Sequence, residues 1–96
     1  MKSEKEIEEF YTRLKDELTQ TSSWPSEYLY KFIIPNSLEK QEQLTAVFSD
    51  KKSETTFRES SNGKYLSVSV KLVMQNPDEV IQYYKEAGKV EGILSL

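Results

Sequence analysis

The sequence predicts an α+β fold in which two helices cover one face of a four-stranded antiparallel sheet. Three observations predict it. Segments with helical spacing of apolar residues alternate with segments rich in aromatic and β-branched residues, and a hairpin signal joins two of the latter directly. The 96 residues are enough for one hydrophobic core and too few for two. We therefore expect one domain, preceded by one additional helix.

The first segment, Ser3 to about Gln20, predicts an amphipathic helix whose start is rich in glutamate, where the helix dipole favours anions. The polar stretch before Pro25 ends it. Helix and linker are expected at residues 1–22 and the main domain at residues 23–96. The helix either packs on its own domain, for example over an apolar end of the outer sheet face, or binds a second chain. Its apolar residues share one face: Ile7, Phe10, Tyr11, Leu14 and Leu18.

Residues 28–34, YLYKFII, predict a strand that is covered on at least one face. Pro35 ends it. Asn36 is expected to cap the next helix, with Glu39 placed for a capping box. That helix runs to about Phe48, and its apolar residues are Leu38, Leu44, Val47 and Phe48.

Asn62-Gly63 is the strongest hairpin signal, because both residues accept the positive φ that a type I′ turn requires. Such a turn pairs the segment ETTFRES with the strand that follows and places Phe57 opposite Val68. Phe57 then lies on the core side of the sheet. The next strand contributes five residues to that side: Leu66, Val68, Val70, Leu72 and Met74.

Residues 76–79, NPDE, predict the start of the last helix, with Asn76 as N-cap and proline in the first turn. Gly88 is expected to end it in the left-handed conformation, and KVEGILSL to form the last strand. The order β-α-β-β-α-β with right-handed crossovers is typical of the ferredoxin-like plait. The first and third strands then lie in the centre of the sheet.

Three stretches, WPSEYLYKFII, SSNGKYLSVSVKLVM and VIQYYKEAGKVEGILSL, together resemble the YbeD-like family of small bacterial proteins. Its members combine an aromatic-Pro start, a Ser-x-Gly-x-Tyr-x-Ser-Val hairpin and a YEELGK-type ending. The resemblance covers about Trp24 to Leu96. It implies a fold similar to the ACT domains that regulate amino-acid enzymes, and no established biochemical role. ACT domains that bind amino acids usually have a glycine after the first strand, where this chain has IPNS, so the resemblance does not extend to that site.

Composition excludes several kinds of site. The chain has no Cys and no His, so thiolate and imidazole catalysis, disulfides and the usual zinc sites are absent, and we expect no cofactor or metal. A net charge of −3 without a basic cluster argues against nucleic acid. An RNA-binding sheet also needs several exposed aromatics, whereas the third strand directs only Tyr65 outward. Without an apolar signal core or membrane span, we expect a soluble cytoplasmic protein with no membrane partner.

The candidate binding residues lie on the sheet face opposite the core. In the predicted register, cations and hydroxyls gather there in a way that suits a carboxylate or phosphate. The set is Lys31, Arg58, Ser67, Ser69 and Lys71. Thr56 lies across from Ser69, and Leu29, Ile33 and Val73 share the face. The alternative is a solvated face on which Glu54 and Lys71 form a weak cross-strand pair.

We therefore expect a non-enzymatic regulatory or protein-interaction module that acts through sheet edges, the outer sheet face or the first helix. Its partner would be another protein or a second copy of the chain. The alternative is an ACT-like sensor of a small anion or amino acid. An enzyme that uses carboxylates alone comes third, since the sequence shows no paired-carboxylate pattern.

Overall fold

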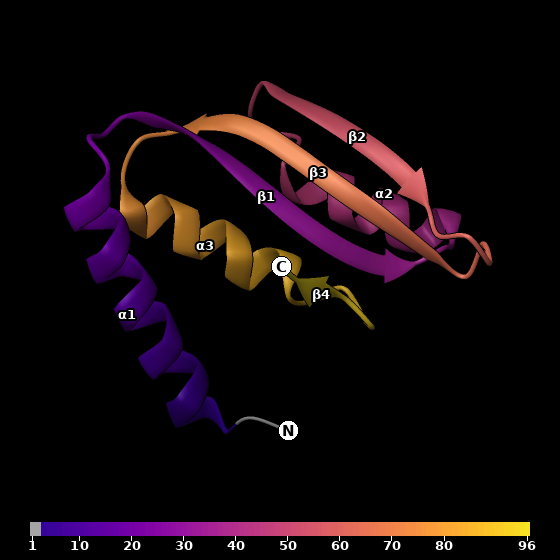
Figure 1. The fold of residues 1–96 in the computed structure, drawn as a ribbon, viewed down its shortest axis with the longest axis horizontal. Helices are drawn as coiled ribbons and strands as arrows, with labels where there is room; N and C mark the ends of the chain where they lie inside the picture. The colour runs from indigo at the N-terminus through magenta and orange to yellow at the C-terminus, as the bar shows by residue number, and fades with distance from the viewer. Residues whose placement is uncertain (1–2) are drawn as a thin grey trace.

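The computed structural model describes residues 3–96 (Figure 1). Its sheet has the strand order β2-β3-β1-β4 with antiparallel neighbours, which confirms the predicted plait with β1 and β3 in the centre. The elements in chain order are α1 (Glu4–Thr21), β1 (Ser26–Pro35), α2 (Leu38–Val47), β2 (Ser53–Glu59), β3 (Tyr65–Met74), α3 (Pro77–Ala87) and β4 (Leu94–Ser95).

The core lies between the sheet and the helices α2 and α3. Alternate residues of β1 point into it, and Tyr30, Phe32 and Ile34 are fully buried. The Tyr30 hydroxyl donates a hydrogen bond of 2.7 Å to the carbonyl oxygen of Val80 on α3. This bond satisfies the one polar atom that the Tyr30 side chain takes into the core.

The β2–β3 hairpin has the predicted register, with Phe57 opposite Val68, but a different turn. The type I′ prediction is wrong, because Gly63 has φ +71° while no described non-glycine residue has a positive φ. The Gly63 N–H donates to the Ser60 carbonyl, and the Ser60 N–H donates to the Tyr65 carbonyl. The loop therefore consists of residues 61–64, two residues more than predicted. The strand register is still the predicted one, because residues 62 and 63 are at the centre of both loops.

Two helix ends differ from the sequence prediction. The N-cap of α2 is Ser37, whose hydroxyl accepts from the Lys40 N–H, whereas Asn36 donates to the Gly63 carbonyl and the Glu59 carboxylate. Asn36 thus fastens the end of β1 to the hairpin. Gly88 ends α3 with φ −61°, so its predicted left-handed conformation is wrong. Asn76 is the N-cap of α3, as predicted.

Two apolar positions are more exposed than the sequence predicts. Leu38, at the start of α2, is 69% exposed and does not join the core, while Leu44 and Phe48 do. Phe57 lies on the core side of β2, yet it is 40% exposed because β2 is an edge strand. The last strand is also shorter than predicted, since only Leu94–Ser95 pair with β1.

The first helix, α1, packs on its own domain, but against α3 and not over the outer sheet face (Figure 1). The Trp24 indole N–H donates to the Leu18 carbonyl at 3.1 Å, and both side chains pack against the core. An ion pair of 2.8 Å joins Lys15 to Asp78 at the start of α3. No residue of α1 is fully buried, so this helix lies outside the core.

Candidate functional site

One face of the sheet, opposite α2 and α3, is covered by no helix of the described chain, and we call it the open face. Alternate residues of each strand project from it, because successive side chains of a strand point to opposite sides. Leu94 belongs to it because it pairs with Ile33. The open face consists of Glu27, Leu29, Lys31, Ile33, Glu54, Thr56, Arg58, Tyr65, Ser67, Ser69, Lys71, Val73 and Leu94.

The structure brings all five predicted site residues onto the open face, in three neighbouring rows across the strands. We call them the upper, middle and lower rows. The upper row is Arg58–Ser67–Ile33, the middle row Thr56–Ser69–Lys31, and the lower row Glu54–Lys71–Leu29. Neighbours within a row are about 5 Å apart, and consecutive rows are about 7 Å apart. The predicted cations therefore share one surface.

The ion pairs on the open face differ from the predicted ones. Lys71 Nζ lies 3.5 Å from the carboxylate of Glu27 on β1, not of Glu54 across on β2. Both partners are about half exposed, so this pair is worth little to stability. Within residues 3–96, neither Glu54 nor Arg58 forms an ion pair.

The charge of the open face is opposite in sign to that of the chain. Three basic residues, Lys31, Arg58 and Lys71, and two acidic ones, Glu27 and Glu54, give it a formal charge of +1. The chain as a whole has a formal charge of −3. The face therefore favours anionic groups over the rest of the surface.

Apolar side chains are unusually exposed on this face. Leu29 is 49% exposed, Tyr65 49%, Val73 52% and Leu94 59%. Leu96 extends the same edge, since its N–H donates to the Lys31 carbonyl at 2.9 Å. The sequence does not predict that Leu94 and Leu96 lie here, because only the pairing of β4 with β1 shows which residues of ILSL point outward. Exposed apolar groups gathered in this way mark interaction surfaces more often than single ones do.

A hollow of about 190 Å³ lies at the Lys71 end of the open face. It is lined by both cations and carboxylates, among them Glu27, Lys52, Glu54 and Lys71. Of the five predicted site residues, only Lys71 reaches it. The other four do not line it.

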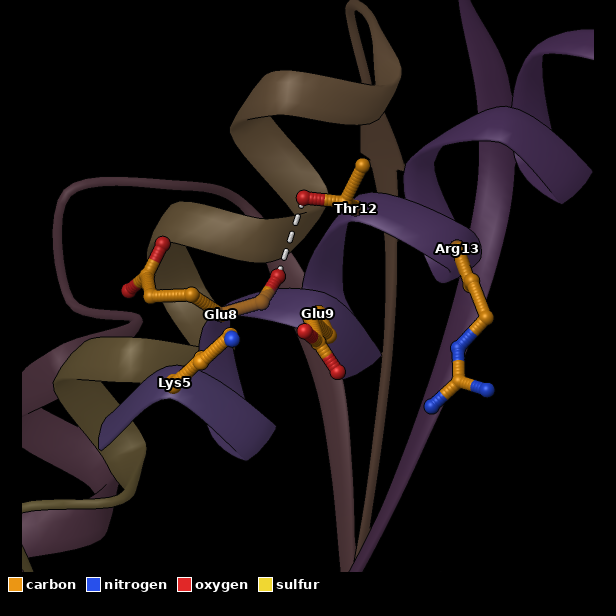
Figure 2. Close-up of a pocket in the computed structure, with 5 residues that line it drawn as sticks. All are labelled: Lys5, Glu8, Glu9, Thr12 and Arg13. Carbon is orange, nitrogen blue, oxygen red and sulfur yellow. Dashed lines mark hydrogen bonds between the residues drawn. The ribbon is translucent and has the colours of Figure 1, made fainter. Parts of the chain in front are cut away.

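A second hollow, of about 510 Å³, lies on the outside of α1 (Figure 2). All of its lining residues, Lys5, Glu8, Glu9, Thr12 and Arg13, come from this one helix, and Glu8 and Arg13 point away from each other. The Thr12 hydroxyl donates to the Glu8 carbonyl of its own helix at 2.9 Å. No polar groups converge here, so this hollow is not a binding site by its chemistry.

A third hollow, of about 340 Å³, lies between the loop after α2 and α3 and is mainly acidic. Three of its polar groups have partners: the Tyr83 hydroxyl donates to Asp50 at 2.7 Å, and Glu79 lies 2.6 Å from Lys51 beside the hollow. Burial raises the pKa of Tyr83 to about 12, and Asp50 adds to the rise. Burial also acts to raise the pKa of Glu79, but its hydrogen bonds from Lys51 and the Gln75 N–H prevail and hold that pKa below its ordinary value.

These contacts fasten the loop to α3. No cluster of His, Cys, Asp or Glu within residues 3–96 could hold a metal ion. On the open face, by contrast, Glu54 and Arg58 form no ion pair within residues 3–96 and several apolar side chains are exposed. The open face is therefore the candidate functional site.

Known proteins place the chain in a family. Residues 19–95 match the model of the family described as "Protein of unknown function (DUF493)". No curated protein matches the chain. Among solved structures, the ACT domain of GTP pyrophosphokinase from Chlorobium tepidum is similar, with a TM-score of 0.53 and 16% identity. That similarity covers 74% of this chain and 100% of the ACT domain, and at this identity it shows the fold alone.

None of the described helices is long and apolar enough to span a membrane. The helix α1 lies mostly before the part of the chain that the family model matches, and the open face lies within it. The sequence resemblance and the α+β plait are thus both confirmed, and this chain belongs to the DUF493, or YbeD-like, family with an ACT-like fold.

Proposed function

We propose that this chain is a non-enzymatic protein-interaction module that binds its partner through the open face. One observation carries the proposal: exposed apolar residues and unpaired charges lie together on a sheet face that the described chain leaves uncovered. An antiparallel sheet commonly has one face in water, but the outward residues of such a face are polar. Here Leu29, Tyr65, Val73 and Leu94 are each about half exposed or more.

The composition and shape of the face support binding over catalysis. The chain has neither Cys nor His, which removes thiolate nucleophiles and imidazole general bases. Small-molecule active sites are concave and enclose their substrate, whereas four of the five candidate residues line none of the hollows described above. The face combines exposed apolar residues with charges that the fold leaves unpaired, and protein interfaces contain both kinds of group.

A photo-crosslinking amino acid at Thr56, in the middle row of the open face, tests this proposal in cells that make the full chain. The matched control carries the same group at Glu42, which is exposed on α2 on the helix side of the sheet. We expect discrete adducts from position 56 and none from position 42. No adduct from position 56, or the same adducts from both positions, would refute an open-face partner.

The second candidate function is an ACT-like sensor of a small anion or amino acid. It is supported by the position of Lys31, Arg58 and Lys71 in adjacent rows, with the hydroxyls of Ser67 and Ser69 between them. Carboxylates and phosphates suit such a set of donors.

Thermal unfolding against amino acids, nucleotides and acidic metabolites tests the sensor. A ligand at 100 times its Kd adds about 2.7 kcal/mol, and a domain of this size shifts by roughly 4–8 °C per kcal/mol. The double variant Arg58→Glu with Lys71→Glu should abolish the shift and leave the domain folded. A shift that persists in the double variant would exclude these residues as the site.

A further inference from the structure

We infer that the open face binds the open face of a second copy of the chain. A two-fold axis that crosses the strands at the middle row relates the two copies. This inference rests on the proposed function and names its partner. Three features carry it: the order of the rows, the charges that the fold leaves unpaired, and the position of the exposed apolar residues.

The row order makes the two ends of the open face complementary. Two sheets packed face to face keep their strands within about 30° of each other. Consider a two-fold axis in the plane between the two sheets and perpendicular to the strands. It places each strand over its own copy in the second chain, and it exchanges the rows on either side of the axis. With the axis on the Thr56–Ser69–Lys31 row, Glu54 of one copy faces Arg58 of the other.

The same axis matches the apolar residues. Leu29 in the lower row of β1 faces Ile33 in the upper row of the second copy. One row further out on β3, Val73 faces Tyr65 of the second copy, and these side chains are 52% and 49% exposed. Leu29, Ile33, Val73 and Tyr65 thus each meet an apolar residue, and the two-fold axis repeats both contacts.

The charges that this axis pairs have no ionic partner within their own chain. Glu54 and Arg58 are four residues apart on β2, which separates them by about 13 Å in an extended strand. Neither takes part in an ion pair within residues 3–96. In the symmetric complex each would have one partner, and the contact occurs twice.

Lys31 is the exception, because it lies in the middle row and faces its own copy. Its long aliphatic stem can extend along Leu96 at the edge of the sheet and keep the ammonium in water. The two like charges still repel. Lys31 therefore weakens the complex, and its neutral replacement Lys31→Gln should tighten it.

Charge reversal with sedimentation equilibrium of the full chain tests the inference. The monomer has a mass of 11.2 kDa, and a dimer twice that. Glu54→Arg and Arg58→Glu should each weaken self-association roughly 10- to 100-fold, because each change places like charges at two symmetric contacts. The double variant should restore it to within about threefold of wild type, since the pair is then reversed but still opposite. Glu42→Arg, on α2, makes the same change in net charge as Glu54→Arg and should not affect self-association.

A second measurement does not depend on charge. Because the chain contains no cysteine, Ser69→Cys introduces a single thiol on the proposed axis. A short bismaleimide should join two copies through this thiol, and Glu42→Cys should not be joined.

A chain that stays monomeric to millimolar concentration would overturn the inference, as would a dimer in which the double variant is no better than the single ones. The proposed function would fail separately, through the absence of adducts from position 56. Adducts of that position with a different protein, from a monomeric chain, would refute the second copy and keep the open-face module.

Discussion

Tyr83 and Glu79, one turn apart on α3, hold the loop that follows α2. Tyr83 donates to Asp50 at 2.7 Å, while Glu79 accepts from Lys51 at 2.6 Å and from the Gln75 N–H at 3.0 Å. Charge-assisted hydrogen bonds of this kind are about twice as strong as neutral ones. The network also makes the stability of the fold sensitive to pH.

The Tyr83 contact predicts a loss of stability at alkaline pH. Burial and the Asp50 carboxylate raise the Tyr83 pKa from 10.0 to about 12, so the folded chain keeps a proton that the unfolded chain releases earlier. The stabilisation is complete below pH 10 and is lost as the pH rises to about 12. Burial raises the pKa of Tyr30 and Tyr84 in the same direction.

Urea unfolding at intervals from pH 8 to about pH 12 measures this effect. The free energy of unfolding should fall over the upper part of the range, and less steeply in Tyr83→Phe than in wild type. Tyr65→Phe, on the open face, is the control and should retain the wild-type slope. Identical slopes in Tyr83→Phe and wild type would show that burial and Asp50 do not raise the Tyr83 pKa in the folded chain.

Among the elements, the β2–β3 turn and the end of α3 each contain a glycine, and the two glycines have different backbone conformations. Gly63 has φ +71°, and a Cβ built on it would meet nothing within 4 Å. Gly88 has φ −61°, which any residue adopts, and its Cβ would lie 3.3 Å from the Tyr84 carbonyl. The two positions should therefore respond differently to alanine.

We expect Gly63→Ala to lower the free energy of unfolding by about 1–2 kcal/mol, because only glycine adopts positive φ without steric cost. Gly88→Ala should change it by less than about 0.5 kcal/mol, or raise it slightly, since alanine restricts the unfolded chain. Urea unfolding of both variants decides the matter. A loss of similar size at Gly88 would mean that α3 ends in the left-handed conformation that the sequence predicts.

At the scale of the whole molecule, the sheet separates a buried face from the open one. Val70 and Val73 show the difference within one strand: Val70 pairs with Tyr30 and is 1% exposed, whereas Val73 pairs with Glu27 and is 52% exposed. The same side chain thus serves the core at one position and the surface at the other.

This difference in burial predicts that the same substitution, valine to alanine, affects mainly stability at position 70 and mainly self-association at position 73. Val70→Ala should lower the free energy of unfolding by about 1–3 kcal/mol, because it leaves a cavity between the sheet and the helices. Val73→Ala should cost less than about 0.5 kcal/mol and should weaken self-association by removing the contact with Tyr65 of the second copy. Denaturant unfolding and sedimentation together measure both effects. Equal stability losses would contradict the assignment of the open face.

Local signals predicted the elements well where a single short-range interaction decides them. Asn76 and Pro77 start α3 as predicted, and alternation placed the apolar residues of β3, among them Val68, Val70 and Met74, in the core. The hairpin register was right although its turn type was wrong, since both loops are centred on the same two residues. The N-cap of α2 was placed one residue too early, because Asn36 is drawn to the hairpin by partners that are distant in sequence.

Periodicity and a register that one turn sets are enough to predict the order of the elements, the core face of β1 and β3 and the position of the candidate residues on the open face. They do not predict that α1 packs on α3, that Glu27 and not Glu54 pairs with Lys71, or that Leu94 and Leu96 extend the open face. These depend on contacts between segments far apart in the chain, and local propensities do not encode which distant surfaces fit together.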